Sequence, residues 1–294
     1  MHPGGLSGRR ASYAAFMTNR HLPYVLTSPS AIIFIATFVV PFIYFFVISF
    51  WTVDYFDMVR TASLDNYREM AEKYVGVSVY TLWLSVITAL MTVIVGFLYA
   101  FTARFKLPRH ADLLIFVVLI TMFGGYLMKI YAWKTILGNE GVLNSALMAA
   151  GAIREPVSSL LYSPGAVVVT LLHFALPFAV LPIYASMRGI KDIEIEVARD
   201  LGASPLGTFT TVIVPRCRPG IVTAFSFAFL ITAGDYITPI LVGGKQTLIG
   251  NLIAPQFGMQ FNWPLGSAMS FVMLAIAVLA IFLFSRLAAW WCKI

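Results

Sequence analysis

The stretch EVARDLGASPLGTFTTVIVP, residues 196–215, decides the fold of this chain. It begins with charged residues, contains two glycines and ends in a proline, and long apolar runs precede and follow it. Glycine and proline are the residues that most often mark turns and helix ends. A charged segment with these marks between two apolar runs indicates a defined structure outside a membrane rather than a continuation of a hydrophobic core.

The composition assigns the chain to the membrane proteins. Of its 294 residues 60% are hydrophobic and 11% are charged, whereas a soluble domain has about 25% charged residues. A helix needs about 20 apolar residues to cross a bilayer, and an open chain cannot leave its backbone unpaired in lipid. We therefore expect an all-α membrane protein with six transmembrane helices: 28–50, 77–103, 112–137, 164–187, 217–243 and 266–290. The third and fifth runs lead into stretches such as FGGYLMKIYAW, so their outer ends are poorly defined.

The distribution of lysine and arginine predicts the orientation. Cytoplasmic segments of membrane proteins are enriched in these residues, so we expect both termini and residues 188–218 in the cytoplasm. The domain organisation is then a cytoplasmic tail of residues 1–27, a six-helix membrane domain of residues 28–290 and a cytoplasmic tail of residues 291–294. The same distribution explains the net charge of +7 without nucleic acid as a partner. The segments assigned to the cytoplasm carry 13 of the 20 basic residues, namely Arg9, Arg10, Arg20, Arg104, Lys106, Arg109, Arg188, Lys191, Arg199, Arg216, Arg218, Arg286 and Lys293.

Two outer loops, residues 51–76 and 138–163, are long enough to hold short surface helices. The sequence TASLDNYREMAEKY, residues 61–74, places acidic and basic residues at helical spacing. It is either a helix that lies flat on the outer face or a solvated connector.

Residues 189–215 form, by local pattern, two short helices joined by a tight turn. Gly202 can end the first helix with a positive φ. Ser204 can cap a second helix whose first residue is Pro205, and we expect that helix to end at Pro215. Such a knob is either a docking element for a cytoplasmic partner or an amphipathic connector on the membrane. In the first helix an apolar stripe lies beside a row of acidic residues, which needs arginines or a partner to offset its repulsion: Ile190, Ile193, Val197 and Leu201 beside Asp192, Glu196 and Asp200.

The same residues resemble the EAA signature of permease subunits of binding-protein-dependent ABC importers. That pattern places a glycine four residues and a proline seventeen residues after its last alanine, and Ala198, Gly202 and Pro215 are in register with it. Val197 stands where the signature has its first alanine. The resemblance implies a type I ABC importer permease fold with a cytoplasmic coupling-helix loop, in which Glu196, Ala198, Gly202 and Pro215 couple the permease to a cytoplasmic ATPase.

The resemblance also implies the partners and cofactors. The chain would sit in the bacterial cytoplasmic (inner) membrane with an ATPase dimer, a second and different permease, and a periplasmic or surface binding protein. The segment GGKQT, residues 243–247, lacks the spacing of a phosphate-binding loop. We therefore expect no enzymatic activity in this chain and no cofactor bound to it, with ATP and Mg held by the partner ATPase.

Three further blocks resemble the first of the two paired permeases of spermidine/putrescine importers. They are RGIKDIEIEVARDLGAS at residues 188–204, KIYAWKTILGNEGVLN at residues 129–144, and GDYITPILVGGKQTLIGNLIAPQF at residues 234–257 together with NWPLGSAMS at residues 262–270. The resemblance implies import of polyamines. Sister systems for γ-aminobutyrate and opine-type compounds share much of the pattern, so these solutes are the alternative.

One acid, Asp235, stands well inside a predicted span and suits a path for cations. A charge in the bilayer costs about 2.5–3.5 kcal/mol or more, so such residues usually face a cavity or a partner. Tyr236, Tyr131 and Trp133 could add aromatic faces that attract ammonium groups. Alternatively, Asp235 caps a broken helix or pairs with Lys129 or another subunit, and the outer aromatics form an interfacial belt.

Two other classes of membrane protein fit less well. A secondary transporter driven by an ion gradient often shows internal repeats and several intramembrane charges, and neither is evident here. A membrane enzyme or metalloprotein needs a catalytic or metal-binding constellation, but the histidines form no metal pattern and His173 is expected to be a hydrogen-bonded packing residue. The cysteines, Cys217 and Cys292, are expected to be apolar fillers.

Overall fold

A computed structural model describes residues 22–55, 57–245 and 247–291, with side chains from residue 27 onward. The tail expected at residues 1–27 lies largely outside the described residues, as does the tail beyond Trp291, including Cys292. Five described helices are long and apolar enough to cross a membrane, and a bent helix pair makes a sixth candidate. The five are Thr27–Ile48, Val75–Lys106, Pro164–Arg188, Pro205–Ala233 and Trp263–Trp291.

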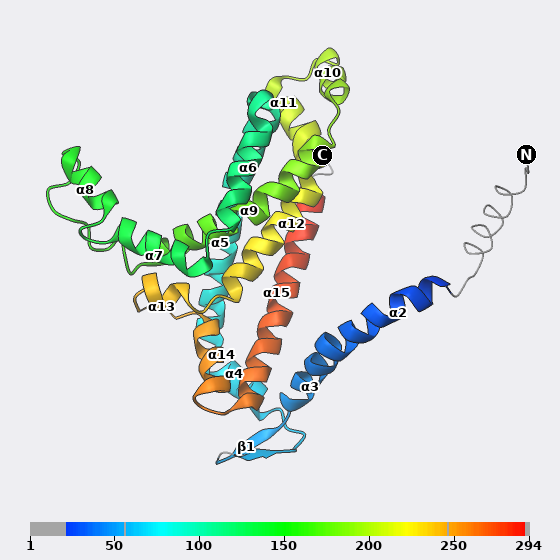
Figure 1. Cartoon of the computed structure of the whole chain (residues 1–294), viewed down its shortest axis with the longest axis vertical. Coiled ribbons are helices and arrows are strands. Elements are labelled where there is room, and N and C mark those ends of the chain that lie inside the picture. Colours follow the sequence, from blue (N-terminus) through cyan, green and yellow to red (C-terminus); the bar gives the residue numbers. More distant parts are fainter. Residues whose placement is uncertain (1–21, 56, 246, 292–294) are drawn as a thin grey trace, which may run out of the picture.

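Helices α5 (Val75–Phe101), α9 (Pro164–Arg188) and α12 (Val214–Ala233) form the centre of the bundle, and α15 (Trp263–Trp291) packs on α12 (Figure 1). The core is rich in small side chains, which let helix backbones approach closely where no hydrophobic effect drives them together. The buried alanines of this core are Ala89, Ala100, Ala175, Ala179, Ala224, Ala228, Ala233 and Ala277.

The closest crossing is between α9 and α12 at Gly220. A Cβ at that position would lie 2.5 Å from the carbonyl oxygen of Pro182 and 2.6 Å from Oγ of Ser186. Because both groups belong to one packed helix, the substitution Gly220→Ala must move α12 away from α9. Overpacking of this kind costs about 1–3 kcal/mol, and we expect a lower midpoint of thermal unfolding in detergent.

Gly76 offers the matched control for that measurement. It lies in the first turn of α5, and a Cβ there would meet no atom within 4 Å. Alanine is the better helix former by about 0.5–1 kcal/mol, so Gly76→Ala should leave the midpoint unchanged or raise it. Equal midpoints for the two variants would contradict the close crossing at Gly220.

Within the described part of the chain, three π-helical segments adapt the helices to prolines. They are η1 (Ile35–Val39), between α2 (Leu22–Phe34) and α3 (Val40–Ile48), η2 (Thr102–Lys106) and η4 (Phe209–Ile213). They precede Pro41, Pro108 and Pro215. The wider turn relieves the clash of a proline ring with the carbonyl four residues earlier. The prediction that a helix ends at Pro215 is therefore wrong, because η4 carries the chain into α12 without a break.

The third and fifth predicted spans are broken. Residues 112–137 were expected as one helix, but η3 (Pro108–His110) and α6 (Ala111–Met122) meet α7 (Tyr126–Leu137) at a bend of 97°. Gly124 and Gly125 lie at this break, where they weaken a continuous helix. Beyond α7, the short helix α8 (Val142–Ala149) extends sideways from the bundle (Figure 1).

The fifth span was expected to continue to residue 243 and to contain Asp235. Instead α12 ends at Ala233, and a short helix α13 (Thr238–Val242) follows after four residues in irregular conformation. Figure 1 shows α13 about halfway along the length of α15. Asp235 therefore lies at a helix break in the middle of the bundle, not inside a helix.

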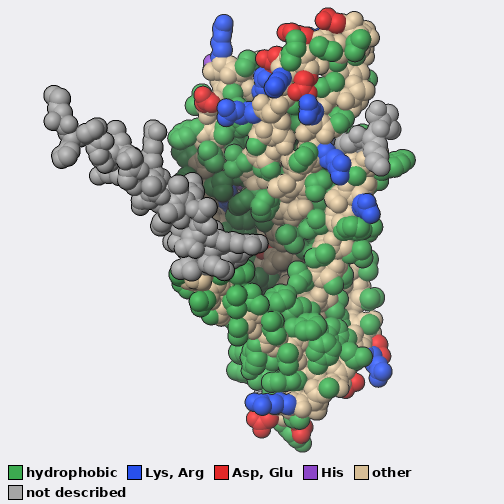
Figure 2. Space-filling view, turned by 90° about the vertical axis from the view of Figure 1, so that its right-hand side faces the viewer, with side chains coloured by type: hydrophobic (Ala, Val, Ile, Leu, Met, Phe, Trp, Pro, Cys, Tyr) green, Lys and Arg blue, Asp and Glu red, His purple; other side chains and the backbone are tan. Residues whose placement is uncertain are grey.

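The end of the bundle opposite α10 is closed by short elements. A hairpin of β1 (Thr52–Asp54) and β2 (Asp57–Val59) is followed by α4 (Asp65–Lys73), which confirms a helix within residues 61–74. The chain returns through α14 (Ile249–Gly258) to α15. Charged side chains gather mainly toward the two ends of the face in Figure 2, with a hydrophobic band between them, as a membrane-spanning protein requires.

Helix α3 and the segment before it leave the bundle. Only 6% of the Thr27–Ile48 span is buried inside the chain. Its buried end is Ile48, and Phe42 and Phe46 reach the ring of Phe271 on α15 at centroid distances of 5.0 Å each. Most of the surface of this span is therefore left for lipid or for another subunit.

Candidate functional site

The segment between the fourth and fifth spans forms a knob, residues 191–208, made of α10 (Asp192–Asp200) and α11 (Pro205–Thr208). Gly202 has a φ of +86°. Its N–H donates to the carbonyl of Arg199 at 2.8 Å, and the N–H of Ala203 donates to the carbonyl of Ala198 at 3.0 Å. These two bonds are the Schellman closure of a helix, which favours glycine at the left-handed position.

The second helix of the knob begins as the sequence predicts. Oγ of Ser204 accepts a hydrogen bond from the backbone N–H of Gly207 at 3.0 Å, and Pro205 is the first helical residue. The predicted turn and cap are therefore confirmed. Figure 1 shows α10 standing beyond the ends of α6, α9 and α12, so the knob is an end of the molecule and not a part of its side wall.

Two ion pairs fasten α10 to the helices beneath it. Nη2 of Arg104 lies 2.7 Å from Oδ1 of Asp192, and Nε of Arg216 donates to Oε2 of Glu194 at 2.9 Å. The hydrogen bond from Arg216, more than any other contact, lowers the pKa of the Glu194 carboxyl. Sequence reasoning missed Glu194 as an anchor because its arginine lies 22 residues later and only the folded chain brings them together.

The direction of the pKa shift of Glu194 determines how this anchor depends on pH. Because the folded-state pKa of Glu194 is lowered, the ion pair stabilises α10 above the ordinary glutamate range and is lost as the pH falls through the lowered pKa. At neutral pH, Glu194→Gln should remove the same stabilisation and speed amide hydrogen exchange in α10 several-fold. Glu196→Gln is the control, since no ion pair or side-chain hydrogen bond involves Glu196 among the described residues. Equal exchange rates in both variants would contradict the anchoring role.

The outer face of the knob is apolar and exposed. Ile190, the first residue of the predicted stripe, is buried in the bundle, but Leu201 and Leu206 are 83% and 71% exposed, and Ile193 and Val197 are also exposed. Glu196 is exposed beside them. Exposed apolar side chains gathered at a charged rim are typical of protein interaction sites.

The second candidate site surrounds Asp235. Its Oδ1 accepts hydrogen bonds from the hydroxyl of Tyr126 and from the backbone N–H of Ile237 at 3.1 Å, and the Tyr126 hydroxyl also lies 2.8 Å from Oγ1 of Thr238. Asp235 is only 7% exposed. Its other oxygen, Oδ2, is buried and has no hydrogen-bond partner among the described residues. One carboxylate oxygen thus caps the start of α13, and the other is buried without a compensating hydrogen bond from the described residues.

A cavity of about 350 Å³ adjoins this carboxylate. Its walls include the aromatic rings of Tyr126, Phe174 and Tyr236, and the Tyr126 and Phe174 rings meet edge to face at 4.8 Å. A free carboxylate oxygen with aromatic walls is a chemical match for an ammonium group. The cavity is lined by Tyr126, Phe174, Leu230, Ile231, Gly234, Asp235, Tyr236 and Ile237.

The other residues expected along a path are placed differently. Lys129 is buried, with Nζ 5.2 Å from the centre of the Phe174 ring, and forms no ion pair with Asp235 among the described residues. Trp133 donates from Nε1 to Nδ1 of His173 at 3.0 Å, which confirms His173 as a hydrogen-bonded packing residue. Tyr131 is exposed and, like Trp133, does not line the Asp235 cavity.

Sequence reasoning missed Tyr126, Phe174 and Gly250 at this site. A Cβ on Gly250 would lie 2.8 Å from the carbonyl oxygen of Asp235, so glycine lets α14 press against the helix break. The signal for Tyr126 was the pair of glycines directly before it, which marks the break that aims its hydroxyl at α13. Phe174 carried no signal, because one phenylalanine among 24 in an apolar chain is not distinctive.

Comparison with known proteins gives relatives over most of the chain. It is 33% identical over 242 residues to the spermidine/putrescine transport system permease protein PotB of Escherichia coli (strain K12), covering 81% of this chain and 87% of the relative. It is 32% identical over 226 residues to PotB of Haemophilus influenzae, covering 76% and 79%. It is 29% identical over 256 residues to the inner membrane ABC transporter permease protein YdcU of Escherichia coli, covering 82% and 81%. No family model matches.

Solved structures share the fold. A bacterial ABC transporter that imports the acidic polysaccharide alginate matches with a TM-score of 0.72 at 16% identity, covering 95% of this chain and 98% of that chain. The alginate transporter in complex with a periplasmic protein bound to an alginate pentasaccharide matches with a TM-score of 0.67 at 18% identity, covering 90% and 92%. At such identities the likeness concerns the fold alone.

Proposed function

The chain belongs to the family of spermidine/putrescine transport permeases, and from this premise we propose that it carries polyamines through an ATP-driven importer. It is a permease subunit of an ABC importer and a multi-pass protein of the inner membrane, and it is not itself an enzyme. The observation that carries the proposal is the 33% identity to PotB over 87% of that relative. The free carboxylate oxygen of Asp235 beside an aromatic cavity supports it from the chemistry of the site.

The knob at residues 191–208 is the proposed contact with a cytoplasmic ATPase dimer, which would hold ATP and Mg. With the knob in the cytoplasm, the expected topology of the chain places both termini on the same side of the membrane as the knob. Glu196 offers a free acceptor, and Ala198 and Gly202 keep the helix surface small enough for close approach. Pro215, behind η4, joins the knob to α12 without a hinge, so that a push on α10 reaches the transmembrane helix directly.

The remaining partners are a second, different permease and a periplasmic or surface binding protein. A second permease is supported by the Thr27–Ile48 span, of which only 6% is buried within this chain. It is also supported by the Asp235 cavity, which lies at a helix break rather than in a closed channel of this chain alone. Two permeases facing each other would enclose a path between them.

A zwitterionic solute such as γ-aminobutyrate is the second candidate substrate. Lys129 places a buried ammonium group 5.2 Å from the same Phe174 ring that lines the Asp235 cavity. A carboxylate of the solute could face Lys129 while its ammonium group faces Asp235. A polyamine has no carboxylate, so Lys129 would only repel it.

Reconstitution of the chain with its second permease and ATPase tests the proposal. ATP hydrolysis should rise when binding protein loaded with spermidine or putrescine is added outside, and labelled polyamine should accumulate inside the vesicles. The same assay with γ-aminobutyrate tests the second candidate. Uptake that follows a proton or sodium gradient without nucleotide would overturn the proposal.

A further inference from the structure

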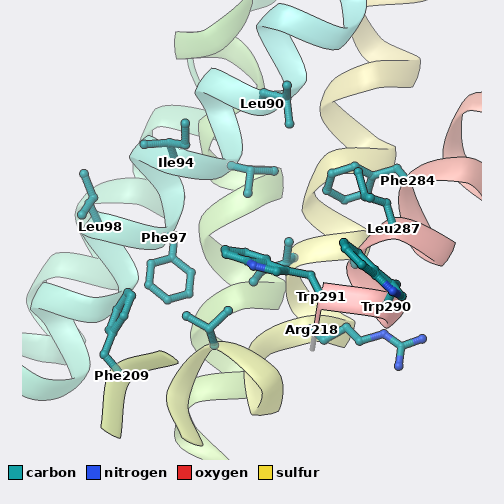
Figure 3. A pocket seen from close by; sticks show the side chains of 14 residues that line it. Leu90, Ile94, Phe97, Leu98, Phe209, Arg218, Phe284, Leu287, Trp290 and Trp291 are labelled. Atoms are coloured by element: carbon teal, nitrogen blue, oxygen red, sulfur yellow. The ribbon is translucent and has the colours of Figure 1, made fainter. Parts of the chain in front are cut away.

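A second concave surface lies far from Asp235, at the end of the bundle that carries the knob. It is a groove of about 470 Å³ between α5, α12 and α15, and Figure 3 shows its side chains pointing into the space between these helices. Arg218 is the one charged side chain among its described lining residues. The groove is lined by Leu90, Val93, Ile94, Phe97, Leu98, Phe209, Val214, Arg218, Ile221, Phe284, Leu287, Ala288, Trp290 and Trp291.

Among the described residues, no acidic group pairs with the charge of Arg218. Its side chain is exposed, and no ion pair or side-chain hydrogen bond involves it among the described residues. By contrast, Arg104 and Arg216 at the same end are paired with acids of the knob. The groove therefore has an unpaired guanidinium at its edge, which can bind an anion. Its apolar walls can bind a hydrocarbon chain.

Two tryptophans stand next to this guanidinium. Trp290 and Trp291 end α15, are exposed, and lie beside Arg218 at one end of the groove in Figure 3, while Leu90 and Ile94 mark the other end. Tryptophan is enriched at the boundary between hydrocarbon and headgroups. The groove therefore runs from headgroup level into the hydrocarbon layer.

We propose that this groove binds an anionic phospholipid of the cytoplasmic leaflet, with its phosphate on Arg218 and one acyl chain along α5. The leaflet rests on the proposed orientation of the knob. One guanidinium group can donate two parallel hydrogen bonds to two oxygens of a phosphate. Basic pockets between transmembrane helices on the cytoplasmic side are typical sites for anionic headgroups. An apolar helix of another subunit would fill the groove but would leave Arg218 without a counter-charge.

The site lies at the base of the knob. Phe209 follows α11 directly and Val214 begins α12, and the Phe209 ring meets Phe97 and Phe101 of α5 at centroid distances of 5.7 and 5.8 Å. An acyl chain in the groove touches Phe209, Val214, α5 and α15 together. The bound lipid thus holds the continuous η4–α12 connection against α5 and α15, and coupling to the ATPase depends on it.

Native mass spectrometry of the assembled transporter tests the site, with bilayer discs of phosphatidylcholine containing or lacking phosphatidylglycerol as the source of lipid. We expect the wild type to retain phosphatidylglycerol, and Arg218→Gln to retain at least fivefold less. Arg286→Gln is the matched control, because Arg286 is an exposed arginine of α15 that stacks on Phe282 and does not line the groove. Equal retention by both variants would overturn the proposal.

A second variant tests the acyl chain separately from the charge. Ile94 is exposed in the groove, and Ile94→Trp should fill it and reduce retention while Arg218 is intact. Phosphatidylglycerol should also raise polyamine-stimulated ATP hydrolysis in the wild type but not in Arg218→Gln. A cross-link from residue 94 to the second permease at full yield would show a protein in the groove and overturn the lipid site. Retained lipid without any ATP hydrolysis would instead refute the proposed function alone.

Discussion

Lysine in place of Glu196 is expected to abolish polyamine uptake while the chain still folds and inserts. Glu196 lies on the exposed side of α10 and has no partner among the described residues, so nothing in the fold depends on its charge. The proposed ATPase surface would instead meet a cation where it had met a carboxylate. Like charges brought together in a protein interface cost several kcal/mol, which is an affinity loss of about 30-fold or more.

Two measurements on one preparation separate this effect from misfolding. Co-purification of the ATPase with the Glu196→Lys permease should fall by that factor, and stimulation of ATP hydrolysis by the loaded binding protein should disappear. The midpoint of thermal unfolding of the permease should equal that of the wild type. Glu72→Lys is the same exchange at an exposed position on the opposite end of the molecule. It should leave both the co-purification of the ATPase and the stimulation of ATP hydrolysis intact. Wild-type uptake by the Glu196 variant would refute the docking role of the knob.

The knob could be predicted from sequence because its determinants are local. Gly202 adopts the positive φ that its place after a helical stripe indicates, and Ser204 caps the next helix at the distance its spacing requires. Both interactions join residues no more than a few positions apart. The end at Pro215 was predicted wrongly for the same local reason. Proline usually stops a helix, but the π-helical turn η4 accommodates it, and the packing of Phe209 on α5 holds that turn in place.

The transmembrane spans could be located by hydropathy, but their breaks could not. Hydropathy detects the length of an apolar run and does not detect whether its backbone stays helical. The 97° bend after Met122 and the end of α12 at Ala233 depend on glycines and on contacts with α9 and α14. The Asp235 site is built from these breaks, so its acid could be predicted and its surroundings could not. Tyr126, Phe174 and Gly250 reach it from three other helices.

Replacement of Asp235 by asparagine is expected to lower polyamine uptake by roughly 10- to 150-fold, the equivalent of the 1.5–3 kcal/mol typical of a hydrogen bond to a charged group. Asparagine retains an Oδ1 that can accept from Ile237 and Tyr126, so the cap of α13 is preserved. Only the charge and the free oxygen Oδ2 are lost. Labelled spermidine uptake by reconstituted vesicles measures the effect, with ATPase binding as evidence that the assembly is intact.

Neighbouring variants show whether the carboxylate acts on the substrate or only on the fold. Tyr131→Phe changes an exposed aromatic outside the cavity and should have no effect. Tyr126→Phe removes one hydrogen bond to Oδ1 and should lower uptake less than Asp235→Asn does. Unchanged uptake in Asp235→Asn would leave the residue with a structural role as the cap of α13.

Lys129→Gln then decides between the two candidate substrates. If the substrate is a polyamine, Lys129 is a resident cation that competes with it at the Phe174 ring, and its removal should raise uptake. If the substrate is a zwitterion, Lys129 supplies the counter-charge for a carboxylate, and its removal should lower uptake as strongly as the loss of Asp235. Opposite effects of Asp235→Asn and Lys129→Gln therefore identify a substrate that carries positive charge only, and parallel losses identify one that carries both signs.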